Sequence, residues 1–316
     1  MKGRKTKDGK WNKAVSKNVA LLCVGGMLLG MAPAQPVQAA SQKQVAEETA
    51  STYKNKEKIY LDSTWKYADH AKIKSGYAVM YTAKTNRKNL IIAVNAGHGT
   101  KGGSAVKTLC HPDGSAKLTG GTTAAGSIRA VAVSEGMAFR DGTPERAVTL
   151  RMAKLLKERL LAQGYDVLMV RDGEDVQLDN VARTVICNNV ADCHIALHWD
   201  GDGLSYDKGC FYISVPEGLK KMKPVDAYWQ LHNALGESLI KGLRTEGVKI
   251  SGSGATAIDL TQTSYSTIPS VDIELGNQCS NHSEKTLETT ADGLVQGVNR
   301  FAKKYLHAEA VSNSAN

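Results

Sequence analysis

The sequence predicts an α/β fold, with a single mostly parallel or mixed sheet and helices on both of its faces. From residue 89 onward, short apolar runs rich in β-branched residues alternate with longer segments in which apolar side chains recur every three or four positions. Such alternation is typical of strand–helix units built around one sheet. With 316 residues, of which 42% are hydrophobic and 22% charged, the chain is also long and apolar enough to bury a full core.

Five strands and four helices are expected in this region. The expected strands cover residues 90–95, 166–171, 193–198, 210–215 and 271–275, and the expected helices cover 144–163, 180–190, 225–245 and 283–306. An apolar stripe from Val148 to Leu160 marks the first helix, and Gly164 supplies its C-terminal stop. Two connections, residues 99–143 and the segment from Trp199 to the last strand, are longer than simple turns. Long loops at one edge of a sheet often recognise substrates.

The terminal segments are not expected to join this domain, which should span residues 89–306. Residues 1–39 have the composition of a secretory signal peptide: basic residues precede an apolar run too short to span a membrane, and small residues at Val37 and Ala39 suit cleavage before Ala40. An uncleaved N-terminal anchor is the alternative. We expect residues 40–88 to be a polar lead-in with a small β appendage, and residues 307–316 to be a frayed tail.

Charge and cysteine content exclude two classes of protein. The formal net charge is +9, but residues 1–39 hold seven basic residues and one acidic residue, so the remainder carries only +3. The positive charge is therefore no argument for nucleic-acid binding. Five widely spaced cysteines follow residue 39 without a Cys-x-x-Cys pair, which favours small buried side chains over a disulfide framework or a structural zinc site, although one bridge is possible.

The side chains that could bind a metal or transfer a proton lie where strands and helices are expected to end or begin. His98 follows the first strand within Gly97-His98-Gly99, His198 ends the third, Glu145 begins the first helix, and Glu274 lies near the end of the last strand. Because the carboxyl ends of parallel strands share one edge of a sheet, these four side chains are expected to meet there. Histidine and carboxylate are natural zinc ligands. Taken singly, each position also fits an ordinary structural role.

A dinucleotide-binding loop is the alternative interpretation of the segment around His98. Residues Gly97 to Gly102 match the pattern G-x-G-x-x-G directly after a strand. That motif needs a helix to open at once so that its N-terminus meets the pyrophosphate. Here a long glycine-rich loop follows instead, and a bulky histidine stands where the backbone would approach phosphate. The sequence therefore disfavours nucleotide binding.

The other histidines are expected to play no part in the site. His194 shares a strand face with His198, but four strand residues span roughly 13 Å, so the two cannot bind one metal. His111, like Asp113 beside it, is expected at the surface of the long loop, and His232 and His282 are expected to be structural. The sequence contains neither His-Glu-x-x-His nor Gly-x-Ser-x-Gly, which argues against a thermolysin-like peptidase and a serine hydrolase.

Four stretches follow one another in the order of a known family. They are Val94-Asn95-Ala96-Gly97-His98-Gly99, the segment from Gly164 to Arg171, the segment from Arg183 to His198, and Pro269-Ser270-Val271-Asp272-Ile273-Glu274-Leu275-Gly276. Together with Glu145, they resemble the motifs of the zinc-dependent N-acetylmuramoyl-L-alanine amidases, the amidase-3 family. The resemblance covers roughly residues 89–306. It departs from the family pattern at Asn95, where aspartate is usual, after His198, after Gly276, and in the longer 99–143 loop.

The resemblance implies a phosphorylase/hydrolase-like α/β fold and a secreted hydrolase that cleaves the amide between the lactyl group of N-acetylmuramic acid and L-alanine. His98, Glu145 and His198 would hold Zn²⁺. Glu274 would move the proton of the attacking water to the leaving amine, and its apolar strand neighbours would raise its pKa. The implied partner is peptidoglycan, at the cell wall or in the periplasm, with no nucleic acid and no membrane span after signal removal.

Two other functions stay open at this point. One is a secreted zinc peptidase or carboxypeptidase that acts on the stem peptide of peptidoglycan. The other is a non-catalytic wall-binding protein built on an amidase fold, against which the intact set of four residues argues.

Overall fold

The computed structural model describes residues 53–306. The expected signal peptide at 1–39, the first part of the lead-in and the tail at 307–316 lie outside the described residues. Among the helices of residues 53–306, none combines the length and the apolar character that a membrane crossing requires.

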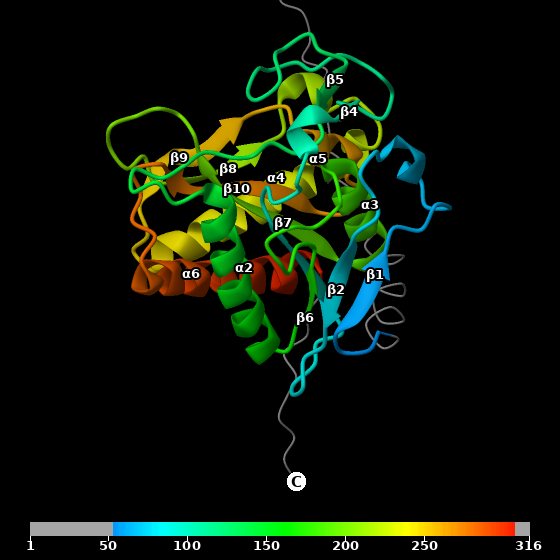
Figure 1. Ribbon diagram of the computed structural model, residues 1–316. Helices are drawn as coiled ribbons and strands as arrows, with labels where there is room; N and C mark the ends of the chain where they lie inside the picture. Colours follow the sequence, from blue (N-terminus) through cyan, green and yellow to red (C-terminus); the bar gives the residue numbers. More distant parts are fainter. Residues whose placement is uncertain (1–52, 307–316) are drawn as a thin grey trace, which may run out of the picture. The chain divides into compact units, whose positions relative to one another are not determined.

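One eight-stranded sheet runs through the described part of the chain (Figure 1), in the order β1-β2-β6-β3-β7-β10-β8-β9. Its strands are β1 (Glu57–Tyr60), β2 (Tyr77–Tyr81), β3 (Ile91–Ala96), β6 (Asp166–Met169), β7 (Cys193–Asp200), β8 (Cys210–Ser214), β9 (Ile250–Ala257) and β10 (Ser270–Asn277). The four central strands, from β6 to β10, are mutually parallel. Antiparallel pairs flank them, β2 with β6 and β8 with β10. This is the mixed, mostly parallel sheet that the sequence predicts.

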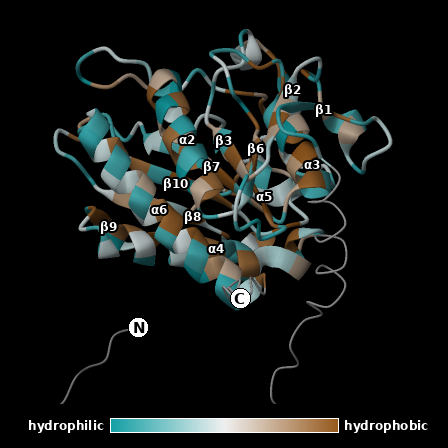
Figure 2. Cartoon of the chain, turned by 90° about the horizontal axis from the view of Figure 1, so that it is seen from below, coloured by the Kyte–Doolittle hydropathy of each residue, from teal (hydrophilic) through white to brown (hydrophobic). Residues whose placement is uncertain are grey.

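Helices cover both faces of the sheet, as predicted. Packed against one face are α2 (Glu145–Ala162), α4 (Val225–Thr245) and α6 (Glu284–Tyr305), and against the other α3 (Asn180–Val190) and the short α5 (Thr261–Tyr265). Strand β3 is buried on both sides: Ile92 belongs to the core under α2, and Ile91 to the core under α3. Two-sided burial explains why its sequence is a continuous apolar run. In Figure 2 the hydrophobic colour gathers on the inner strands, whereas much of α2 and α6 is hydrophilic.

The helix and strand predictions are confirmed to within about two residues at most ends, and α3 and α4 coincide with the expected ranges. The predicted stripe of α2 is fully buried at Val148, Met152, Leu156 and Leu160. The five cysteines of the described part are all unpaired, and four of them are buried. Strand β9 and helix α5 have no counterpart in the sequence prediction.

The two strand-like runs of the lead-in, expected to form a small β appendage on the main domain, correspond to strands β1 and β2. Strand β1 pairs with β2, and β2 pairs antiparallel with β6, with Val79 level with Met169. They therefore extend one edge of the main sheet. An alternating pattern in sequence marks a strand but does not name the neighbour with which it pairs.

The long connection from Gly99 to Thr143 contains structure of its own. It holds a 3₁₀ turn at Gly103–Ala105 and a small two-stranded antiparallel sheet, β4 (Lys107–Leu109) with β5 (Arg129–Val131). We call residues 99–143 the insertion; its two-stranded part lies above the main sheet in Figure 1. The prediction that His111 lies at the surface is wrong: the residue is fully buried, with Nε2 2.9 Å from Asp259 Oδ1. Its partner lies far along the chain, beyond the reach of any local pattern.

Candidate metal centre and active-site pocket

Three side chains from separate elements meet at the carboxyl edge of the sheet. His98 comes from the turn after β3, Glu145 is the first residue of α2, and His198 lies in β7. The Oε1 atom of Glu145 is 2.8 Å from His98 Nε2 and 3.1 Å from His198 Nδ1, and these two nitrogens are 3.0 Å apart. All three ligand atoms lie within 4.8 Å of one another. The structure thus brings together the three residues that the sequence singles out as metal ligands.

The turn that carries His98 depends on two buried arginines. His98 has a φ of 64° and Gly99 a φ of 70°, a left-handed conformation that few residues other than glycine adopt. Arg171 Nη2 donates to the carbonyl of Gly97 at 3.0 Å, and Arg183 Nη2 donates to the carbonyl of His98 at 2.7 Å. Burial lowers the pKa of Arg171 to about 10 and that of Arg183 to about 9. Through the hydrogen bonds to the two carbonyl oxygens, both guanidinium groups hold the turn in place.

The remaining polar atoms of His98 and Glu145 are occupied by backbone groups. His98 Nδ1 lies 2.8 Å from the carbonyl oxygen of Ser134 in the insertion, so it carries the proton and leaves the lone pair of Nε2 facing the other two ligands. Glu145 Oε1 accepts from the Trp199 amide at 3.0 Å, and Oε2 accepts from the Met137 amide at 2.9 Å. The two side chains are thereby held in one orientation each.

Two glycines leave the space that this cluster needs. A Cβ atom on Gly97 would lie 2.2 Å from Cε1 of His198. A Cβ atom on Gly136 would lie 2.8 Å from both Glu145 Oε2 and His98 Cδ2. Two imidazoles and one carboxylate form a donor set typical of a catalytic zinc site, which keeps a further position open. The residues present therefore fit a divalent metal ion.

Electrostatics favour a charged pair within the cluster. Burial would raise the pKa of Glu145, but the hydrogen bonds and charges of His198 and His98 hold it well below its usual range. Burial would lower the pKa of His198, but the charges of Asp272 and Glu145 raise it to about 10. The carboxylate of Glu145 is thus ionised under all physiological conditions, as a metal ligand must be.

Glu274 stands beside the cluster on the neighbouring strand. Strand β10 runs parallel to β7, and Glu274 is level with His198 in the register. Its Oε2 atom is shielded from solvent and has no hydrogen-bond partner among the described residues. Burial raises the pKa of Glu274 well above its usual value, and the charge of Asp272, two residues earlier on the strand, adds to the shift. The direction agrees with the sequence prediction, which did not anticipate the contribution of Asp272.

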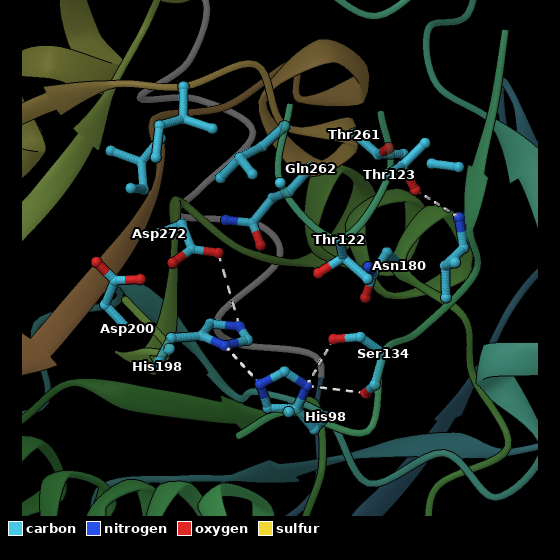
Figure 3. A pocket seen from close by; sticks show the side chains of 18 of the residues that line it. His98, Thr122, Thr123, Ser134, Asn180, His198, Asp200, Thr261, Gln262 and Asp272 are labelled. Carbon is cyan, nitrogen blue, oxygen red and sulfur yellow. Dashed lines mark hydrogen bonds and ion pairs between the residues drawn. The ribbon is translucent and has the colours of Figure 1, made fainter. Parts of the chain in front are cut away.

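The four predicted residues line one pocket with a cavity volume of about 700 Å³. Its floor is the edge of the sheet, and its walls come from the insertion and from the segment between β9 and β10. Figure 3 shows Thr122, Thr261 and Gln262 across the pocket from His98 and His198. The insertion therefore contributes to the site twice, through the pocket wall and through the Ser134 carbonyl that orients His98.

Three further histidines that were expected to lie outside the site, His194, His232 and His282, lie apart from the cluster. His194 is buried and faces the hydroxyl of Ser270 at 3.3 Å, and His232 accepts from the Ser270 amide at 2.9 Å. His282 Nε2 lies 3.1 Å from Asp141 Oδ2. Sequence reasoning missed Ser134, Gly136 and Asp272. Only Asp272 left a usable signal, because it lies two residues before Glu274 and so shares its strand face.

The fold and the pocket define an α/β protein with a group of metal-ligating side chains at the carboxyl edge of its sheet. Residues 92–301 match a family model described as N-acetylmuramoyl-L-alanine amidase. The chain belongs to this family, and its reaction is the hydrolysis of the peptidoglycan amide between N-acetylmuramic acid and L-alanine. The family match spans the strands and helices that carry all four predicted residues.

Solved structures share this fold. The amidase Ami1 from Mycobacterium smegmatis is 19% identical, with a TM-score of 0.56 over 68% of this chain and 97% of that one. The apo form of Ami1 from Mycobacterium abscessus is 20% identical, with a TM-score of 0.55 over 68% of this chain and 98% of that one. At such identities the similarity shows the fold alone. The search of curated proteins returned no match.

Proposed function

We propose that the amidase reaction of this chain depends on zinc held by His98, Glu145 and His198, with Glu274 as the acid–base residue. The observation that carries the proposal is the convergence of two imidazole nitrogens and one ionised carboxylate oxygen within 4.8 Å, next to Glu274. When bound, a zinc ion polarises the scissile carbonyl and makes water more acidic. The choice of zinc over other divalent ions follows from the nitrogen-rich donor set.

The roles of the protein groups follow from their placement. Glu274 lines the pocket with an oxygen that has no hydrogen-bond partner within residues 53–306, and this oxygen would accept a proton from the attacking water and deliver it to the leaving amine. A raised pKa suits a group that must both gain and lose a proton in one turnover. Glu145 and His98 are held by backbone partners and His198 by contacts with side chains, so the site needs little reorganisation during the reaction.

Substitution of the acid–base residue tests this assignment. We expect Glu274→Gln to retain zinc at wild-type stoichiometry while kcat falls by about 10²–10⁴-fold, since the amide cannot take up the proton. Glu135→Gln is the matched control, because Glu135 also lines the pocket but lies on the insertion. Full activity of Glu274→Gln with zinc bound would show that the proton passes through another group.

Export belongs to the same proposal. The basic segment, the apolar run and the small residues before Ala40 support secretion to the cell wall or periplasm, where the substrate is found. Expression of the full chain in a secreting host should yield a protein that begins near Ala40, as measured by mass spectrometry of the intact chain. A cell-associated product with residues 1–39 still attached would support the N-terminal anchor instead.

A further inference from the structure

Asp272 is a buried carboxylate in contact with one member of the metal cluster. It lies on β10, is 9% exposed, and places Oδ2 3.6 Å from Nε2 of His198 (Figure 3). This separation is that of an ion pair and exceeds hydrogen-bond length. Its other oxygen, Oδ1, is shielded from solvent and lacks a hydrogen-bond partner among the described residues. Among the described residues, the ion pair with His198 is the polar side-chain contact that Asp272 makes.

His198 depends more than His98 on a side chain that fixes the proton on its outer ring nitrogen. The two histidines present different nitrogens to the cluster: His98 presents Nε2, and His198 presents Nδ1. Neutral imidazole carries one proton, so Nδ1 of His198 can bind a metal only when Nε2 holds that proton. For His98 the Ser134 carbonyl fixes the proton on the outer nitrogen. For His198 the carboxylate of Asp272 lies 3.6 Å from the outer nitrogen.

A carboxylate beside a metal-ligating histidine has two effects. It favours the tautomer with the proton on the near nitrogen, and it makes the far nitrogen a better donor to the metal. An apolar side chain would do neither, although the neighbours of Asp272 on β10, Val271 and Ile273, are apolar and pack into the core on the other face. The burial of a charged group among such residues costs stability unless a partner offsets it.

We propose that Asp272 is a positioning residue for the proposed metal centre: its carboxylate holds the proton of His198 on Nε2 and so keeps Nδ1 directed at the ion. The inference rests on the proposed function, since it assigns a role only if His98, Glu145 and His198 bind a metal. Asp272 acts through His198 and takes no part in the proton transfer assigned to Glu274.

Zinc affinity measured by chelator competition tests this role. We expect Asp272→Leu to weaken zinc binding by about 10–100-fold relative to wild type, the usual effect of losing such a partner. Asp272→Asn should lose less, because its amide oxygen keeps a partial negative charge near Nε2–H although the full charge is gone. Asp200→Asn is the matched control: Asp200 also lines the pocket, but its partner is Lys208, at 2.8 Å. Its zinc affinity should equal that of wild type.

A second readout separates positioning from general damage to the fold. In zinc-loaded wild type, long-range ¹H–¹⁵N spectra should show His198 protonated on Nε2, and in Asp272→Leu this proton should exchange faster with solvent. Thermal unfolding of each metal-free variant confirms that it folds; if Asp272→Leu does not, Asp272→Asn decides. Zinc affinity of the folded variants within twofold of wild type would overturn the inference. Failure of wild type itself to take up zinc would instead refute the proposed function.

Discussion

At the scale of single residues, the site depends on what surrounds His98 as much as on His98 itself. Its left-handed backbone, the glycine before it and the two arginines that bind the carbonyls of the turn all serve to aim one nitrogen. Asn95 belongs to this support: its Oδ1 accepts from Arg183 at 3.1 Å, so its influence on the turn passes through that guanidinium. Asparagine at this position leaves Arg183 bound to neutral oxygens.

Gly97→Ala should disable the metal centre while leaving the fold intact. The added Cβ would lie 2.2 Å from Cε1 of His198 and would displace the ring. We expect zinc affinity to fall at least about tenfold and amidase activity to fall with it. Gly173→Ala is the control, because its Cβ would meet nothing closer than 3.8 Å. Wild-type zinc affinity in Gly97→Ala would show that His198 is not a ligand in the position described.

The site could be predicted from sequence only in part, for a physical reason that individual residues make clear. Glu145 and His198 sit at the ends of strongly patterned elements, so topology alone brings them to one edge of the sheet. Ser134 contacts His98 Nδ1 through its carbonyl, which any residue type supplies, and through its hydroxyl at 3.1 Å, and a lone serine in a long loop gives no sequence signal for either contact. Gly136 is one glycine among many in the insertion, and only the position of Glu145 shows why it must be small.

At the scale of elements, helices and strands were predicted correctly where burial of one face imposes a periodic pattern of apolar residues. They were missed where no such pattern exists. Strand β9 has the sequence Ile250-Ser251-Gly252-Ser253-Gly254-Ala255-Thr256-Ala257 and lies at the edge of the sheet, half exposed, so it lacks the apolar pattern of a central strand. Helix α5 has five residues, too few to reveal a helical period. The strands of the insertion have three residues each, which is also too short to show an alternating apolar pattern.

One buried residue of the domain, Asp259, binds several residues of the insertion at the outer side of the pocket. Its carboxylate is bound by His111 Nε2 at 2.9 Å and by the amide of Leu118 at 2.6 Å. Its carbonyl accepts from Lys117, and its amide donates to Thr119 Oγ1. Four residues of the insertion therefore depend on a single partner that follows β9, and these contacts fix the outer wall of the pocket.

Asp259→Ala should release this wall. Loss of a buried carboxylate with several donors is expected to lower the free energy of unfolding by about 2–3 kcal/mol, because His111 and the Leu118 amide lose their acceptor. Limited proteolysis should cut within residues 111–131 in the variant first. Asp113→Ala, at an exposed aspartate of the same segment, should remain as resistant as wild type. Equal resistance of both variants would mean that the insertion is held elsewhere.

At the scale of the whole molecule, two buried histidines make stability depend on pH. Burial lowers the pKa of His194 to about 3, with help from the charges of Arg183 and His232, and burial alone lowers the pKa of His232 to about 3. In the unfolded chain each histidine takes up a proton below about pH 6.5. Between pH 6.5 and 3 the unfolded state therefore binds more protons than the folded state, and stability falls as the pH falls.

His232→Gln tests this dependence, since glutamine can still accept from the Ser270 amide. For wild type, each histidine should contribute a loss of about 2 kcal/mol between pH 6.5 and pH 5, at about 1.4 kcal/mol per pH unit. Denaturant unfolding at several pH values should show a loss smaller by about 2 kcal/mol in the variant. Parallel stability curves for the two proteins would mean that His232 is protonated in the folded state.

This chain hydrolyses the amide between N-acetylmuramic acid and L-alanine, and we propose that it does so with a metal ion at His98, Glu145 and His198. Digestion of purified peptidoglycan by the chain from Ala40 onward, with and without chelator, followed by mass analysis of the products, tests it most directly. We predict intact glycan strands and peptides with a free L-alanine amino terminus, abolition of both by chelator, and recovery on addition of zinc. Cleavage within the stem peptide, or release that persists in the presence of chelator, would contradict the account.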